Sequence, residues 1–179
     1  IISYYIIYFK EKFQTVTEFL LVSQHYNIIM PLMKGMAFMK PYLKRAWAEI
    51  SLPALKNNIN QIRRIISDNT EIMAVVKADA YGHGEHNVCH CLWESGVRYF
   101  AVSNLDEALA VRESCPDAEI LILGYTPPEY GQALADNNII QGIVSSEYAK
   151  ELVKHTAKKI KCHVKIDTGM GRIGLKYDS

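Results

Sequence analysis

The sequence has few cysteines, almost no net charge and no dense run of basic residues. Its four cysteines, Cys89, Cys91, Cys115 and Cys162, are too few for a disulfide framework. They are typical of free thiols in a reducing, cytoplasmic setting. A formal net charge of +1 at pH 7 gives no indication of nucleic acid or an anionic membrane surface as a partner.

The sequence also lacks a G-x-G-x-x-G motif after its first buried strand, which disfavours a dinucleotide-binding fold. Short apolar runs alternate instead with helical patterns, which predicts βαβ units and a parallel sheet. The predicted strands are 72–76, 99–102, 119–124, 139–144 and 160–166. A closed (β/α)8 barrel needs eight strands, so the prediction is an incomplete TIM-type barrel of about five βα units.

The residues before the barrel pattern divide into two parts. We expect 1–40 to be a leader or upstream segment outside the domain, which would then cover 41–179; the alternative is the tail of a preceding membrane domain. Ala46–Ser51 alternates weakly and predicts a short strand. Ser51 is a good N-cap for the helix that follows, and Pro53 lies in its first turn, where a missing N–H costs little.

The run Ile72–Val76 predicts a strand that is buried on both faces, and it ends in a lysine, Lys77. The carboxyl ends of barrel strands are where such folds place their chemistry. Partial desolvation there favours the neutral, nucleophilic amine that reaction with a carbonyl cofactor requires. A lysine at a strand end also fits a solvated surface group, so the strand alone leaves both interpretations open.

A second polar constellation lies in Cys162–Leu175, which reads C-H-V-K-I-D-T-G-M-G-R-I-G-L. Strand alternation places His163, Lys165 and Asp167 on one face, and buried charge there would need partners. Arg172 lies inside a glycine-rich loop, where its planar guanidinium suits an anionic oxygen. Without further context, the same pattern also fits a solvated barrel rim.

Several polar residues are interpreted as helix caps. Ser103 and Ser145 are predicted N-caps, and Thr126–Glu129 has the pattern of a capping box. Asp106 and Glu107 are interpreted as carboxylates that complement a helix dipole, not as an acid–base pair.

A cluster of histidines and cysteines raises the question of a metal site. His83, His86 and His90 recur at helical spacing beside Cys89 and Cys91. Cysteines two residues apart do not face each other on a helix, so we favour ordinary packing and expect no metal.

Two strings together resemble one known family. A-V-V-K-A-D-A-Y-G-H-G resembles the pyridoxal-phosphate attachment motif of the alanine racemases across its whole length. H-V-K-I-D-T-G-M-G-R-I-G resembles the second signature of the same family. The two strings occur in the family's order, and the similarity extends from about Arg45 onward.

The resemblance implies roles for four residues. Lys77 would carry the cofactor covalently and serve as one of two catalytic bases, and Tyr81 would bind the cofactor phosphate. Arg172 would contact the phenolic oxygen of the cofactor and the substrate carboxylate. Lys165 matches a lysine that is carboxylated in many members and then steadies the arginine. The second base would be a tyrosine from the partner subunit's carboxyl-terminal domain.

The resemblance therefore implies a homodimeric alanine racemase that uses pyridoxal 5′-phosphate and supplies D-alanine for peptidoglycan. We expect this chain to be an amino-terminal fragment, inactive on its own and poor at binding the cofactor, with neither a nucleic-acid nor a membrane partner for the barrel. Serine, lysine and broad-specificity racemases are close alternatives. A non-catalytic barrel that binds pyridoxal phosphate and a pure interaction module are the alternatives outside catalysis.

Overall fold

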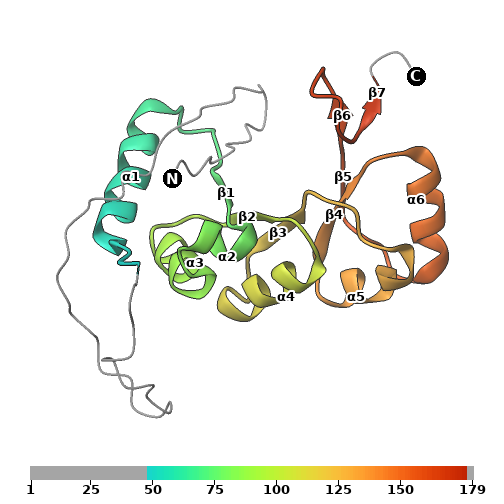
Figure 1. Ribbon diagram of the computed structural model, residues 1–179, viewed down its shortest axis with the longest axis horizontal. Coiled ribbons are helices and arrows are strands. Elements are labelled where there is room, and N and C mark those ends of the chain that lie inside the picture. Colours follow the sequence, from blue (N-terminus) through green and yellow to red (C-terminus); the bar gives the residue numbers. More distant parts are fainter. Residues whose placement is uncertain (1–47, 177–179) are drawn as a thin grey trace, which may run out of the picture.

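The computed structural model describes residues 48–176, which form a five-stranded parallel sheet with helices along one of its faces (Figure 1). The strands are β1 (Met73–Val75), β2 (Tyr99–Val102), β3 (Glu119–Ile122), β4 (Ile139–Ile143) and β5 (Cys162–Val164). They lie in chain order, and each pairs in parallel with the next. This arrangement confirms the prediction of an incomplete TIM-type barrel.

One helix precedes β1 and lies at the upper left of Figure 1, and the others connect the strands along the lower and right-hand parts of the figure. The helices are α1 (Leu52–Ile65), α2 (Lys77–Gly82), α3 (Glu85–Glu94), α4 (Leu105–Ser114), α5 (Gly131–Asp136) and α6 (Ser146–Leu152), with 3-10 turns at Pro128–Tyr130 and Val153–His155. No helix in residues 48–176 is both long and apolar enough to cross a membrane. The predictions for 1–40 lie outside the described residues.

The two faces of the sheet bury separate apolar clusters. On the helix-covered face, alternate strand residues such as Phe100 and Ile120 pack against the apolar stripes of α1, α3, α4, α5 and α6. The opposite face carries a smaller cluster of Met73, Val75, Ala101, Leu121 and Ile140, against which Tyr81 packs. In a barrel this second face is the interior, so the small cluster forms the floor beneath the carboxyl ends of the strands.

The helix after Ser51 forms as predicted. The Ser51 hydroxyl accepts the Ala54 N–H at 3.3 Å, and Leu55, Ile59 and Ile62 face the core. The strand predicted at Ala46–Ser51 is wrong for its described part, because 48–51 form no strand. Ser51 instead turns the chain into α1.

Two of the three other predicted caps are wrong. Ser145 caps α6, since its hydroxyl accepts the Tyr148 N–H at 3.1 Å. Asn104, not Ser103, caps α4. Thr126 begins no capping box: the 3-10 turn that follows has Pro127 at its N-cap position, and the buried Thr126 hydroxyl has no hydrogen-bond partner among the described residues. The Thr126 carbonyl accepts the Tyr148 hydroxyl at 2.8 Å.

The last predicted strand divides into β5 and a short arm. Ile166–Asp167 (β6) pairs in parallel with Leu175–Lys176 (β7), and this arm extends beyond β5 at the upper right of Figure 1. Val164 is 61% exposed and Ile166 is 48% exposed. Apolar strand residues therefore lie exposed in β5 and β6, as expected for an incomplete barrel.

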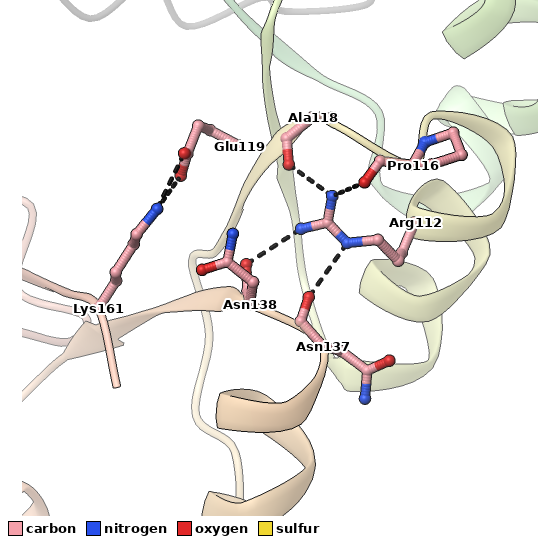
Figure 2. A network of polar contacts seen from close by, with 7 residues as sticks. All are labelled: Arg112, Pro116, Ala118, Glu119, Asn137, Asn138 and Lys161. Carbon is pink, nitrogen blue, oxygen red and sulfur yellow. Dashed lines mark hydrogen bonds and ion pairs between the residues drawn. The ribbon is translucent and has the colours of Figure 1, made fainter. Parts of the chain in front are cut away.

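At the amino ends of the strands, Arg112 of α4 hydrogen-bonds to the loop before β3 and to the loop before β4 (Figure 2). Its guanidinium donates to the carbonyls of Ala118 at 2.7 Å and Pro116 at 2.8 Å, which precede β3. It also donates to the carbonyls of Asn138 at 3.0 Å and Asn137 at 3.1 Å, which precede β4. Burial lowers the pKa of Arg112, but a guanidinium in a protein stays charged. One side chain thus fixes the starts of two neighbouring strands.

Candidate active site

The segment after β1 has an unusual backbone. Ala78, Asp79, Ala80 and Tyr81 have φ values of 52°, 54°, 51° and 56°, so they form a left-handed helical turn. Each non-glycine residue in this conformation costs about 1–2 kcal/mol. Strain of this kind persists where the surrounding structure fixes it, and it concentrates at functional sites.

Three side chains hold the turn in place. Asp79 Oδ1 accepts the Glu85 N–H at 2.6 Å, which joins the turn to the start of α3. The Nδ1 atom of His83 lies 2.9 Å from the Ala80 carbonyl and 3.2 Å from the Tyr81 carbonyl. The third is Glu107, whose Oε1 accepts the Ala78 N–H at 3.0 Å and whose Oε2 accepts the Ser103 N–H at 2.8 Å.

Sequence reasoning missed this use of Glu107. The residue lies in the first turn of α4, as predicted, but its carboxylate reaches across to the segment after β1. Spacing within one helix cannot reveal a contact between residues 29 positions apart. The only available signal was a carboxylate placed soon after the carboxyl end of a parallel strand.

The structure brings Lys77 and Tyr81 together. Lys77 is half-buried, and its Nζ lies 5.9 Å from the centroid of the Tyr81 ring. Tyr81 in turn packs against the apolar cluster on the inner face of the sheet. Burial raises the pKa of the Tyr81 hydroxyl, so at neutral pH it stays protonated and can donate to an anionic oxygen. An amine and a phenol donor are therefore adjacent at the carboxyl end of β1.

The loop between β6 and β7 is organised by Asp167. Its Oδ1 accepts the N–H groups of Gly169 and Gly171, both at 3.0 Å. Gly174 has φ +131°, and a Cβ there would lie 3.0 Å from the Asp167 nitrogen and the Lys165 carbonyl oxygen. The loop can close only with glycine at that position. Arg172 lies exposed within it.

Lys165 and Arg172 follow β5, at the opposite edge of the sheet from β1 and Lys77. The Lys165 N–H donates to the Ile143 carbonyl at 2.9 Å, which places it just past the β4–β5 pairing. Strands β2, β3 and β4 separate this end of the sheet from β1. Convergence of Lys77 and Arg172 on one point requires the sheet to curve into a cylinder, and it stays a prediction.

The histidines of the segment after β1 have separate partners. His83 contacts the left-handed turn, His86 Nδ1 lies 2.9 Å from the Ser114 hydroxyl, and His90 Nδ1 lies 3.6 Å from Glu94. Within the described part of the chain, no three metal-ligating side chains converge on one point.

The Asp167 contacts predict a pH dependence for the loop. The Gly171 and Gly169 N–H groups hold the pKa of Asp167 below its usual range. A lowered folded-state pKa stabilises the loop at neutral pH, and that stabilisation is lost as pH falls through the lowered value. We expect hydrogen exchange of 167–172, corrected for intrinsic rates, to stay slow at neutral pH and to rise only below the ordinary range of an aspartic acid.

The Asp167→Asn variant should exchange quickly in this segment at every pH, since a neutral amide is a weaker acceptor. Asp68→Asn, which changes an exposed aspartate before β1, is the matched control and should leave the loop unchanged. Equal protection in the Asp167→Asn variant and the wild type would contradict this account.

Comparison with known proteins gives one consistent result. Residues 50–179 match the sequence profile of "Alanine racemase, N-terminal domain". "Alanine racemase 1" of Bacillus subtilis (strain 168) is 40% identical over 140 residues, which cover 78% of this chain and 36% of that protein. "Amino-acid racemase" of Enterococcus faecalis is 47% identical over 134 residues, which cover 74% of this chain and 19% of that protein. The chain thus spans about a third or less of these relatives.

A solved structure agrees with this match. The crystal structure of alanine racemase from Bacillus anthracis with bound L-Ala-P superposes with a TM-score of 0.67 at 38% sequence identity. The superposition covers 70% of this chain and 33% of that one. The incomplete barrel is therefore similar to one portion of a larger enzyme fold.

Proposed function

The chain belongs to the alanine racemase N-terminal domain family, and on that premise we propose that the protein interconverts L- and D-alanine with pyridoxal 5′-phosphate as its cofactor. The observation that carries the proposal is the half-buried Lys77 at the carboxyl end of β1, beside Tyr81 and directly before a strained turn. The left-handed turn after Lys77 is held by contacts from Asp79, His83 and Glu107. Such a strained and well-fixed backbone would serve no purpose beside an ordinary solvated surface lysine.

The residues at β1 fit the proposed cofactor. The Lys77 amine is the group that an aldehyde cofactor requires, and the neutral Tyr81 hydroxyl is a donor for a phosphate oxygen. The apolar inner cluster under Tyr81 is a suitable floor for a planar aromatic ring. Pyridoxal phosphate, when bound, supplies a conjugated ring that stabilises negative charge at the substrate α-carbon.

Lys77 has two tasks in this proposal. Its Nζ holds the cofactor between turnovers, and during turnover the freed amine takes the α-proton from one face of the substrate or returns it there. Racemisation needs a second base on the opposite face. We propose that a second copy of the protein provides it, so that the active enzyme is a homodimer.

Arg172 and Lys165 act on the substrate side of the proposed site. The Arg172 guanidinium would bind the substrate carboxylate and the phenolic oxygen of the cofactor. A cationic Lys165 nearby would repel it, whereas a carboxylated Lys165 would attract it. We further propose a cytoplasmic location, supported by the four free cysteines, and a role for the D-alanine product in peptidoglycan.

The test is an assay of the intact protein with L-alanine, D-alanine, L-serine and L-lysine, with pyridoxal phosphate added. We expect the highest kcat/KM with alanine in both directions. Reductive trapping with sodium borohydride, followed by digestion and mass spectrometry, should leave the pyridoxyl group on the peptide that contains Lys77. The control is the same digest without borohydride, which should carry no such group on that peptide.

Each outcome of this test is informative. Labelling of Lys77 together with faster turnover of serine or lysine would support a racemase that acts on a different amino acid. The name "Amino-acid racemase" of the Enterococcus faecalis relative is the reason to test these substrates. Labelling without racemisation of any amino acid would favour a non-catalytic cofactor-binding barrel. Absence of label on Lys77 would contradict the proposal.

A further inference from the structure

The peptide unit between Lys77 and Ala78 is fixed by a side chain from another element. A peptide unit is planar, so the Lys77 carbonyl and the Ala78 N–H lie in one plane and can only rotate together. Glu107 Oε1 accepts that N–H at 3.0 Å. The carboxylate therefore restrains ψ of Lys77 and φ of Ala78, the first residue in the left-handed conformation.

The same carboxylate stands where the β1–β2 ladder ends. The last rung is the bond from the Val76 N–H to the Ala101 carbonyl at 2.9 Å. In a parallel ladder the next N–H on the β1 side would be that of Ala78, but the chain turns away there. Glu107 accepts the N–H groups on both sides of the break, from Ala78 and from Ser103. It thus replaces the missing rung.

The backbone of Ser103 is closely packed. A Cβ on Gly124 would lie only 2.4 Å from the Ser103 carbonyl oxygen, so the end of β2 packs tightly against the end of β3. The backbone N–H of Glu107 donates to Asn104 Oδ1 at 3.0 Å, which fixes the backbone that carries this carboxylate. Ala78 is therefore joined through one carboxylate to the closely packed ends of β2 and β3.

We propose that Glu107 is a positioning residue for the racemase reaction: by accepting the Ala78 and Ser103 N–H groups, it sets the direction in which Lys77 leaves β1. The inference rests on the proposed function and deepens it. Glu107 touches neither cofactor nor substrate in this account, and it acts only through the Lys77 backbone. A local role at the start of α4 would account for the contact with Ser103, which directly precedes the N-cap, but not for the second oxygen on the Ala78 N–H, 29 positions away.

The test replaces Glu107 with glutamine in the intact protein. Glutamine has the same shape but only one acceptor oxygen, so one of the two N–H groups faces an NH2 group and is released. We expect kcat to fall about 10- to 100-fold, the size of effect that a small misplacement of a reacting group produces. KM should change less than about 3-fold. The pH at which the cofactor absorption band changes should also shift, because it reports the surroundings of the Lys77 nitrogen.

A second readout needs no cofactor. In cofactor-free protein, hydrogen exchange of 77–83 should be faster in the Glu107→Gln variant than in the wild type. Asp106→Asn is the matched control, because it removes the adjacent carboxylate from the same helical turn and should leave both readouts within about 2-fold of wild type.

The outcomes separate this inference from the proposed function. An active wild type with an unchanged kcat and band titration in the Glu107→Gln variant contradicts the inference alone. A lower melting temperature with unchanged kcat also contradicts it, since that result describes a merely structural residue. A wild type that racemises no amino acid contradicts both.

Discussion

Replacing Lys77 with arginine should lower racemisation by the intact protein at least about 1000-fold, the range expected when a nucleophile and general base is lost. Arginine keeps the positive charge and nearly the length of the side chain. Its guanidinium stays protonated at any working pH, so it can neither react with an aldehyde nor accept an α-proton. The measurement is kcat/KM for L- and D-alanine, together with the visible absorption of the purified protein.

A rescue experiment separates chemistry from misfolding. The Lys77→Ala variant should be equally inactive, but added methylamine should restore part of the activity, because a free amine can enter the space left by the side chain. Lys150→Arg, an exposed lysine on α6, is the matched control and should retain full activity. Activity of the Lys77→Arg variant within about 10-fold of wild type would show that Lys77 does not take part in the reaction.

Most of the sheet could be predicted because strands β1 to β4 are buried on both faces. In such strands nearly every residue is apolar, so runs such as Glu119–Ile122 and Ile139–Ile143 stand out between polar connections. The helix from Leu52 was also visible, since its apolar stripe has a single period and a good cap. The errors concerned two caps, the described part of the short strand predicted before α1, and the last predicted strand, which divides in two. At a cap, the sequence does not distinguish a buried residue such as Thr126 from an exposed one.

The left-handed turn could not be predicted from local preference. Alanine is the strongest right-handed helix former, yet Ala78 and Ala80 both have positive φ. The conformation is stabilised by contacts from Asp79, His83 and Glu107, and no local pattern records such contacts. The motif thus pointed to Lys77 and Tyr81 as candidates, whereas the contacts that hold the turn between them emerged only in three dimensions.

The second large effect concerns stability and lies at the amino ends of β3 and β4. Replacing Arg112 with methionine should lower the free energy of unfolding by about 2–4 kcal/mol, because it leaves four backbone carbonyls without their charged donor. Methionine keeps most of the apolar stem, so the loss reports the guanidinium and not its packing. The measurement is a urea titration of the intact protein followed by circular dichroism.

The adjacent ion pair in Figure 2 supplies the control. Lys161 Nζ lies 2.9 Å and 3.1 Å from the two carboxylate oxygens of Glu119, and the lysine is exposed. Lys161→Met should therefore cost less than about 1 kcal/mol, as exposed pairs do. Arg112→Lys should fall between the two, since one ammonium cannot span carbonyls before both β3 and β4. Equal losses for Arg112→Met and Lys161→Met would show that Arg112 contributes only as a surface charge.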